Sequence, residues 1–379
     1  MVRLEFSPSA APTLGVEWEL GLVDAGSGDL VQLADQVLAA LPGPDGSPGH
    51  PRIKKELLLN TVELVTGICA NAADARADLA GSLAEVRSVT DGLGVELFSA
   101  GTHPFAAWQD QQVAEGARYA TLIDRTQWWG RQMLIYGVHV HVGMPHRDAV
   151  LPVLSAMLGY HPHLQALSAS SPFWARIDTG YASNRALMFQ QLPTAGLPFQ
   201  FGSWDQYEAY LDDVFATGVI DELGELRWDI RPAPHLGTLE VRVCDGVPTL
   251  REVTALAALT HCLVVEACDR WRDGTLPAPL PPWHVQENKW RAARYGTEAI
   301  VILDAKGTER LVTDDVLDTV TRLAPVARRL GCSAELLDVA ALVEDGASYV
   351  RQREVAATSG GDLRAVVSDL VARLRADVP

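Results

Sequence analysis

Glutamate, histidine and arginine recur at every second position in three short stretches that otherwise consist of strand-forming residues. The stretch LGVEWELGLVD carries Glu17 and Glu19, GVHVHVG carries His139 and His141, and TLEVRVCD carries Glu240 and Arg242. Because alternate side chains of an extended chain share one face, each stretch predicts a strand with one apolar face and one face of ionisable groups.

A fourth stretch, TVELVTG, places Glu63 among apolar and β-branched residues, and Glu56 lies just upstream. A single acidic residue on a strand is usually solvated, and antiparallel strands with one wet face are common. Solvent alone would favour lysine, serine and threonine on such faces, whereas these strands repeat glutamate, histidine and arginine. We therefore interpret the polar faces as the lining of one cavity.

Carboxylates that converge in a cavity repel one another, so they must be protonated or share cations. Carboxylate oxygens with an imidazole suit hard divalent ions, magnesium or manganese, that bridge a polyphosphate, and zinc fits less well because no cysteine takes part. Arg242 and Arg231, in the stretch WDIRP, have planar forks that can clamp phosphate or carboxylate oxygens. The chain has no P-loop and no protein-kinase signature set. The predicted chemistry is therefore metal-assisted phosphoryl transfer.

The segments between these stretches predict the elements that position them. Short strands are joined by hairpin-like turns as often as by helices, which favours an α+β fold with a mostly antiparallel sheet and helices on one side. Helical patterns cover about 74–93, 147–168 and 250–273, and the chain is helical from about Thr313 onward.

Composition excludes several classes of function. The chain has 379 residues, 48% of them hydrophobic, and a net charge of -17, which argues against non-specific nucleic-acid binding. No run of about 18 apolar residues and no signal-peptide pattern occurs, so neither a membrane span nor export is predicted and a cytoplasmic location is expected. The five scattered cysteines form no close pair in sequence, which predicts small core residues in place of a disulfide framework or zinc ribbon.

The same stretches carry a resemblance to a known family. GVEWE, NTVELVTG, GVHVHVG and GTLEVRVCD resemble the GxExE, acidic, GxHxHxG and ExR strands of the type 2 glutamate-cysteine ligase family, whose members are also described as carboxylate-amine ligases. GTHPF, SNRALMFQQLP, WDIRPAP and ENKWRAARYG resemble further blocks of that family. The resemblance runs from about Leu14 to Val312. Its motifs are weak singly and specific together, because they occur in the family's order.

The resemblance implies a catalytic fold of the glutamine synthetase type, with a funnel-like antiparallel sheet, helices packed on its outer face, and ATP and two or three magnesium ions inside. It implies metal ligation by Glu17, Glu19, Glu63, His139 and Glu240, and nucleotide contacts by His141, Arg231, Arg242 and Lys289. Catalytic roles fall to Arg242 at the transferred phosphoryl group, to Glu240, and to Arg231 on phosphate or substrate carboxylate. Glu56, His103, Asn184 and Arg185 lie in matching blocks without an assigned role. Trp18 replaces an acidic residue of many members and by parity faces the apolar side.

The implied reaction transfers the terminal phosphoryl group of ATP to a carboxylate, that of glutamate by expectation, and an amine then displaces phosphate to form an amide. Cysteine or another amino compound can be the amine, and nothing in the sequence selects one. The alternatives are a metal-dependent hydrolase built on the HVH strand, a guanidino kinase of the same superfamily, and a protein that binds nucleotide without turnover.

One catalytic domain is expected to span residues 1–379, with residues 14–312 bearing the motifs and 313–379 forming a C-terminal helical region. A homodimer is the default assembly, because closed two-fold dimers are the commonest.

Overall fold

Alternating apolar and polar residues build the main sheet of the protein, and its order brings the motif-bearing strands together. The structure is a computed structural model and describes residues 4–41, 43 and 49–378. The strands of this sheet are β1 (Leu14–Asp24), β2 (Ile53–Lys55), β3 (Thr61–Val65), β4 (Val95–Phe98), β5 (Gly137–Gly143), β8 (Ile230–Ala233) and β9 (Thr238–Asp245). Their order is β2-β3-β1-β5-β9-β8, with β4 paired to the end of β1, and every pairing is antiparallel.

Helices account for most of the remaining described chain. They are α1 (Ala34–Ala39), α2 (Ala72–Thr90), α3 (Ala117–Arg131), α4 (Arg147–Met157), α5 (His161–Ser168), α6 (Asn184–Phe189), α7 (Trp204–Ala216), α8 (Leu250–Arg272), α9 (Pro282–Tyr295), α10 (Val312–Leu330), α11 (Ser333–Asp345), α12 (Ser348–Thr358) and α13 (Leu363–Asp377). Two short hairpins complete the strands, β6 (Phe173–Trp174) with β7 (Ile177–Asp178) and β10 (Ile300–Ile302) with β11 (Glu309–Leu311).

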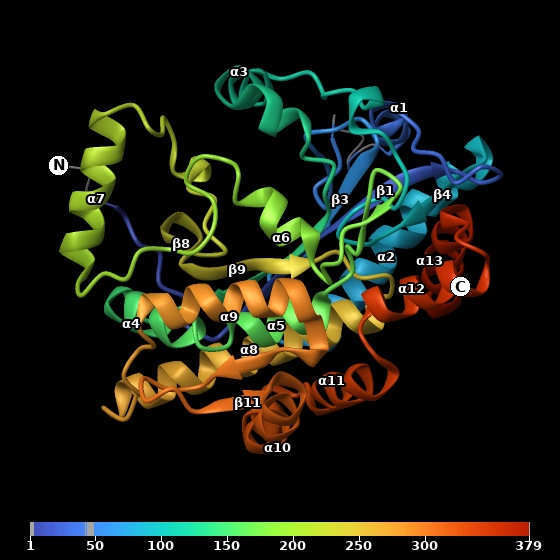
Figure 1. The fold of residues 1–379 in the computed structure, drawn as a ribbon. Helices are drawn as coiled ribbons and strands as arrows, with labels where there is room; N and C mark the ends of the chain where they lie inside the picture. The colour runs from blue at the N-terminus through green and yellow to red at the C-terminus, as the bar shows by residue number, and fades with distance from the viewer. Residues whose placement is uncertain (1–3, 42, 44–48, 379) are drawn as a thin grey trace.

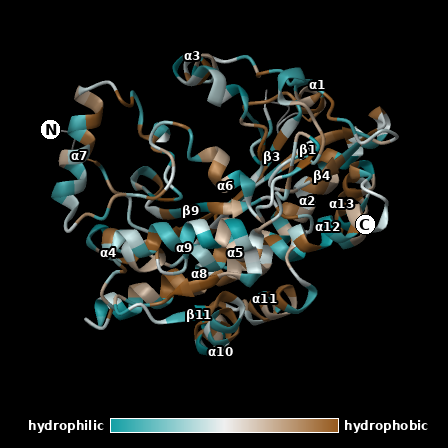
Figure 2. Cartoon of the chain, viewed as in Figure 1, coloured by the Kyte–Doolittle hydropathy of each residue, from teal (hydrophilic) through white to brown (hydrophobic). Residues whose placement is uncertain are grey.

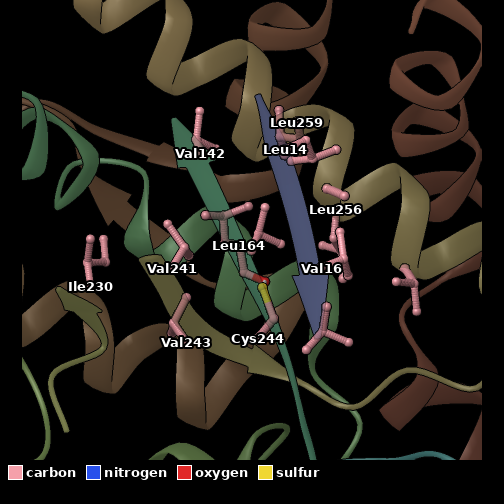
Figure 3. Close-up of a cluster of buried hydrophobic side chains, with 14 of the residues drawn as sticks. Leu14, Val16, Val142, Leu164, Ile230, Val241, Val243, Cys244, Leu256 and Leu259 are labelled. Atoms are coloured by element: carbon pink, nitrogen blue, oxygen red, sulfur yellow. The ribbon is translucent and has the colours of Figure 1, made fainter. Parts of the chain in front are cut away.

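The apolar face of the sheet packs on helices α2, α4, α5 and α8. In Figure 1, α5, α8 and α9 lie on one side of β9, whereas α6 lies on the other. Val16, Val142 and Val241, from three strands, belong to the same buried cluster as Leu256 and Leu259 of α8 (Figure 3). Figure 2 shows hydrophobic colour on β4 and β9, which lie within this layer. Burying one face in this way leaves the other face free to line a cavity.

The long helix α8 is the base of this core. Its first turn is closed by a capping box, in which the Thr249 hydroxyl accepts from the Glu252 N–H and the Glu252 carboxylate accepts from the Thr249 N–H. Sixteen of its residues are buried, which is expected of a helix covered on several sides. The later helices α10 and α11 pack on α8, and α13 packs on α12 and β4.

The helix predicted over 147–168 is two helices. Residues 158–160 form a turn between α4 and α5, where Gly159 interrupts the pattern and Pro162 sits in the first turn of α5. Glycine weakens a helix, and proline is favoured in a first helical turn, so this position suits the end of one helix and the start of the next. In the described part of the chain, no helix is both long and apolar enough to cross a membrane.

Candidate active site

The register of the sheet sets the ionisable side chains opposite one another. Glu17 of β1 pairs across the ladder with His139 of β5, and Glu19 pairs with Glu63 of β3. On the far side of β5, His141 lies opposite Glu240 of β9, which in turn lies opposite Arg231 of β8. Directly opposed residues project from the same face. Five strands therefore present their ionisable groups on one surface.

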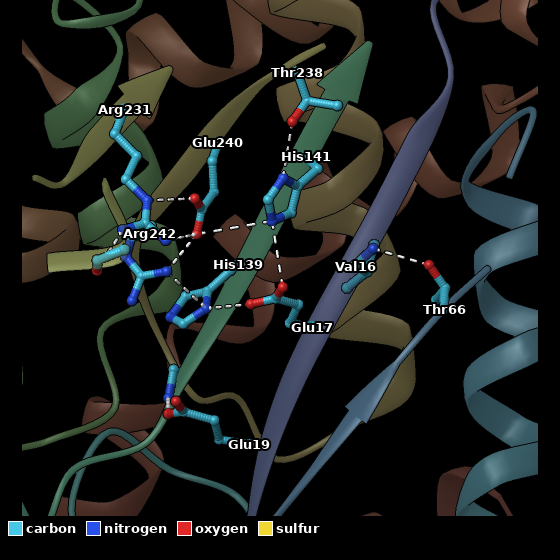
Figure 4. A network of polar contacts seen from close by, with 12 residues as sticks. Val16, Glu17, Glu19, Thr66, His139, His141, Arg231, Thr238, Glu240 and Arg242 are labelled. Carbon is cyan, nitrogen blue, oxygen red and sulfur yellow. Dashed lines mark hydrogen bonds and ion pairs between the residues drawn. The ribbon is translucent and has the colours of Figure 1, made fainter. Parts of the chain in front are cut away.

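Glu17 is the hub of this surface, as Figure 4 shows. Its Oε2 lies 2.9 Å from Nδ1 of His139, and its Oε1 lies 3.3 Å from Nε2 of His141. Burial by itself would raise the pKa of Glu17, but the hydrogen bonds from the two imidazoles hold it well below its usual value. Glu17 is therefore a carboxylate at neutral pH.

The pKa values of the two histidines beside Glu17 are shifted in opposite directions. Burial and the neighbouring Arg242 lower the pKa of His139 to about 4, so its imidazole is neutral. Burial works against a charged His141, yet the carboxylates of Glu240 and Glu17 raise the pKa of His141 above its usual value. The Nδ1 of His141 also lies 3.0 Å from Oγ1 of Thr238, which fixes its ring.

Glu240 binds both predicted arginines. Its Oε2 accepts from Nε of Arg231 at 2.5 Å, and its Oε1 accepts from Nη1 of Arg242 (Figure 4). Burial would raise the pKa of Glu240, but Arg242 and Arg231 hold it far below the usual range. Arg231 is anchored further by the Leu226 carbonyl oxygen, 2.6 Å from its Nη1. Glu240 thus orients two guanidinium groups and stays ionised.

A second group of carboxylates lies at the other end of the surface. Burial and repulsion by Glu56 raise the pKa of Glu19 to about 8, although the Gly137 N–H donates to Glu19 at 2.5 Å. Burial also raises the pKa of Glu56, and burial with the charges of Glu56, Glu17 and Glu19 raises that of Glu63. The three carboxyl groups at this end therefore hold protons more tightly than a solvated glutamate does, because burial and mutual repulsion disfavour their charged forms.

Both ends open on a cavity of about 310 Å³. Of the predicted residues, Glu17, Glu19, Glu63, His139, Arg231 and Arg242 line it. His141 and Glu240 are not among its lining residues and lie behind the ion pairs just described. The structure therefore brings eight of the nine predicted site residues to one place, six of them on the cavity wall.

The cavity also has lining residues for which no role was predicted. They are Glu56, Arg118, Tyr119, Arg185 and Arg227, together with apolar residues from α3, α6 and neighbouring loops. Glu56 and Arg185 did lie in blocks resembling the family. Arg118 and Arg227 lie outside those blocks. Arg118 is on α3, and Arg227 immediately precedes the block WDIRPAP. His103 is instead buried elsewhere, with its Nε2 3.0 Å from the Gly28 carbonyl oxygen.

Arg185 is held at this wall without a direct ion pair in the described chain, and its charge acts on the carboxyl groups of Glu19 and Asp245 from a greater distance. It is 4% exposed, its Nη1 makes only long contacts of 3.4 and 3.5 Å to the carbonyl oxygens of Arg242 and Val243, and its buried Nε has no hydrogen-bond partner in the described chain. A buried cation so weakly paired is suited to an anionic ligand.

Lys289, the ninth predicted residue, lies away from the cavity wall. Its Nζ is 2.7 Å from Oδ2 of Asp229, which is also 3.0 Å from Nε2 of His161. Lys289 is 1% exposed and is not among the cavity-lining residues. Lys289 therefore belongs to a buried ion pair, which is at variance with the predicted contact with the nucleotide.

The residues present fit divalent cations. Three overlapping sets each bring three ligand atoms within 4.8 Å of one another: Glu17 with His141 and Glu240, Glu17 with Glu63 and His139, and Glu19 with Glu56 and Glu63. The Nε2 of His139 is buried without a hydrogen-bond partner in the described chain, while Nδ1 faces Glu17. A carboxylate on Nδ1 leaves the Nε2 lone pair available as a ligand. Carboxylate-rich sets with one imidazole match magnesium or manganese.

Comparison with known proteins identifies the family. The profile described as "Glutamate-cysteine ligase family 2" matches residues 13–369. The chain belongs to this family. The match confirms the resemblance of the motif strands, and it extends beyond the predicted limit of 312 into the C-terminal helices.

Relatives of similar length support the same assignment. A protein of Arthrobacter sp. (strain FB24) named "Putative glutamate-cysteine ligase 2-1" is 62% identical over 378 residues, covering 99% of both chains. A protein of Mycobacterium tuberculosis (strain ATCC 25177 / H37Ra) named "Putative glutamate-cysteine ligase 2" is 57% identical over 372 residues, covering 98% of this chain and 97% of its own.

Two solved structures have the same fold at low identity. A glutamate-cysteine ligase of Francisella tularensis, solved in complex with AMP, has a TM-score of 0.68 at 14% identity and covers 99% of this chain and 94% of its own. A bifunctional glutathione synthetase of Pasteurella multocida has a TM-score of 0.69 at 15% identity, covering 97% of this chain and 52% of its own. These matches confirm the predicted α+β ligase fold.

Membership of the family makes this chain an ATP-dependent carboxylate-amine ligase, as predicted. The comparisons give no support to the metal-dependent hydrolase, or to a protein that binds nucleotide without turnover.

Proposed function

We propose that this member of the family forms a γ-glutamyl amide. In the first step a side-chain carboxylate oxygen of glutamate attacks the terminal phosphorus of ATP, and the bond to the bridging oxygen breaks to release ADP. In the second step an amine attacks the resulting acyl phosphate, the carbon-oxygen bond to phosphate breaks, and the amine loses a proton. Neither step needs a covalent enzyme nucleophile, so positioning and charge stabilisation carry the catalysis.

The observation that supports this proposal most is the pairing of opposite charges within one cavity. Its lining combines the carboxyl groups of Glu19, Glu56 and Glu63 with the guanidinium groups of Arg231, Arg242 and Arg185. A triphosphate with bound cations needs both: carboxylates for the cations and guanidinium groups for the phosphate oxygens. A hydrolase would need neither the arginine cluster nor so many carboxylates.

Magnesium ions, held by the three ligand sets around Glu17 and Glu63, would neutralise the phosphate charge when bound. The work left to the chain is to orient the reacting groups. Glu240 keeps the forks of Arg231 and Arg242 fixed through ion pairs to both. Arg242 is suited to the transferred phosphoryl group, where such an arginine can be worth about 10³ or more in rate. Arg231 is suited to the phosphate or to the substrate carboxylate.

The test is ADP release from the purified protein with Mg-ATP and glutamate, with and without a panel of amines that includes cysteine. Glu17→Gln removes the carboxylate that joins both histidines, and Glu344→Gln, at an exposed position of α11, is the matched control. We expect ADP release that depends on one amine, is lost in Glu17→Gln, and is kept in Glu344→Gln.

The amine that stimulates ADP release would also identify the second substrate, once mass spectrometry shows the amide product. ADP release that is independent of both glutamate and amine would contradict a ligase reaction. The same rate in Glu17→Gln as in the parent would contradict the assignment of this cavity as the active site.

We further propose that residues 1–379 form one catalytic domain, that the protein is a homodimer and that it is located in the cytoplasm. Limited proteolysis tests the first point, since a single domain should yield no stable fragment ending near residue 312. Sedimentation equilibrium tests the second, and a mass of one chain would contradict it. Fractionation of cells that produce the protein tests the third.

A further inference from the structure

Two cysteines that are distant in the sequence meet in the core. Sγ of Cys262, on α8, lies 3.7 Å from Sγ of Cys332, which immediately precedes α11. Both side chains are 0% exposed. The scattered cysteines predicted no disulfide from sequence, but the packing of α11 on α8 brings this pair into direct contact. The other three cysteines, Cys69, Cys244 and Cys268, make no sulfur-sulfur contact in the described chain.

The two thiols are not equivalent. Cys332 occupies the N-cap position of α11, a helix of 13 residues, where the partial positive charge of the helix end favours a thiolate. A hydrogen bond joins the two sulfurs, and it lowers the pKa of Cys332 while it raises that of Cys262. Cys332 is thus the nucleophilic member of the pair and Cys262 the proton-bearing one.

A large cavity is lined by residues that neighbour the pair in the chain, and it is separate from the cavity of the ligase site. It has a volume of about 890 Å³, and its wall includes Val265, Cys268, Arg329 and Leu330. Val265 lies three residues after Cys262 on the same helix, and Leu330 lies two residues before Cys332. Close sequence neighbours of both cysteines therefore line a space that admits small solutes, while the two sulfurs lie behind its wall. None of the residues proposed for the ligase reaction lines this cavity.

We infer that Cys262 and Cys332 form an oxidisable dithiol site that takes hydrogen peroxide, reached through this cavity, and closes to a disulfide. In the first step the Cys332 thiolate attacks one peroxide oxygen, the O–O bond breaks, and a sulfenic acid and hydroxide form. In the second step the Cys262 sulfur attacks the sulfenic sulfur, the S–O bond breaks, and water leaves with the Cys262 proton. Two thiols and one peroxide yield one disulfide and two waters.

The contact distance is compatible with this closure. The sulfurs must approach from 3.7 Å to about 2.05 Å, a movement that side-chain rotation at two cysteines can supply. The disulfide would join residues 70 apart in sequence and enclose α9, the β10-β11 hairpin and α10. A loop of this length restricts the unfolded chain strongly, so the oxidised protein should melt about 5 °C above the reduced protein.

The experiment treats the full-length protein with hydrogen peroxide, alkylates the remaining thiols, and maps peptides by mass spectrometry without reduction. We expect a linked Cys262–Cys332 peptide pair, lighter than its two free thiol peptides by two hydrogen atoms, a higher melting temperature, and reversal of both changes by dithiothreitol. Cys268→Ser is the matched control, because Cys268 lies on the same helix and lines the cavity but is outside the pair. It should keep the crosslink and the temperature shift.

Alanine at Cys262 or at Cys332 should abolish both readouts. Should either variant fail to fold, peptide mapping of the unchanged protein still decides the matter. Peroxide treatment that leaves Cys262 and Cys332 fully alkylated while Cys268 is oxidised would overturn the proposal, as would a crosslink that includes Cys268. The outcome does not depend on ATP, glutamate or an amine, so it is distinct from the test of the ligase reaction.

Discussion

Replacement of Lys289 by methionine should destabilise the protein without weakening nucleotide binding. The Lys289 ammonium is 2.7 Å from Asp229 and is almost fully buried, and the Asp229 carboxylate is itself 5% exposed. Burial would raise the pKa of Asp229, but Lys289 and His161 hold it far below its usual value, so the carboxylate is charged. Methionine fills much of the same volume but removes the main counter-charge.

Removal of one partner of a buried ion pair typically costs about 3–5 kcal/mol, because the other charge is left uncompensated. An unfolding entropy of about 2.1 cal/mol/K per residue gives about 0.8 kcal/mol/K for 379 residues. The expected fall in melting temperature is therefore about 4–6 °C. Asp229→Asn combined with Lys289→Met should recover part of this loss, since no buried charge then remains unpaired.

The loss should depend on pH through His161. Burial lowers the pKa of His161 in the parent protein. Once Lys289 is gone, the adjacent Asp229 carboxylate favours the protonated form of His161, so the pKa of that imidazole should rise above its unfolded value. A raised histidine pKa adds stability below the unfolded pKa, about 6.5, and this stability is lost as the pH rises through the folded pKa. The deficit of Lys289→Met should therefore be smaller at pH 6 than at pH 8.

Differential scanning calorimetry at the two pH values, with and without Mg-ATP, measures both parts of this prediction. Lys306→Met is the control, because Lys306 is an exposed lysine in the β10-β11 turn. The stabilisation that Mg-ATP produces should be equal in the parent and in Lys289→Met. A normal melting temperature combined with weaker stabilisation by Mg-ATP would refute the structural role and restore Lys289 as a nucleotide contact.

Three further predictions concern the cavity. Glu63→Gln should lower ADP release by more than about 100-fold, since even the loss of a group that supports a metal ligand costs about 10- to 100-fold. The melting temperature of this variant in metal-free buffer at pH 8 should not fall, because one of three mutually repelling carboxylates is removed, and a fall would contradict the repulsion. Magnesium binding at pH 7 should release protons and become tighter as the pH rises toward 8, because the pKa of Glu19 is raised to about 8 and ligation needs the carboxylate. Titration calorimetry of magnesium binding in two buffers of different ionisation enthalpy measures the proton release, and equal binding heats in the two buffers would argue against it. Gly137→Ala should lower kcat/KM by about 100-fold with little change in melting temperature. The added methyl group would overlap the Arg185 guanidinium and displace it from the cavity wall. Full activity of this variant would show that the position of Arg185 at the wall is not needed.

The alternation of residues along each strand was sufficient to predict the two faces of the sheet. Trp18 is 0% exposed, as its parity with Val16 and Leu20 required, and its Nε1 donates to the Ser99 hydroxyl. Glu17, Glu19, His139 and Arg242 line the cavity that the polar face was predicted to form. This part is readable because side-chain direction in a strand depends only on the local backbone.

Contacts between distant segments were decided by the tertiary structure alone. The register that sets Arg231 opposite Glu240, the enclosure of Lys289 by Asp229 and His161, and the meeting of Cys262 with Cys332 all join residues that no local pattern connects. Arg118 reaches the cavity from α3, and Arg227 reaches it from the loop before β8, outside the motif-bearing strands. A sequence pattern reports which face a side chain takes on its own element, whereas its partner depends on how the elements pack, and packing is a property of the whole core.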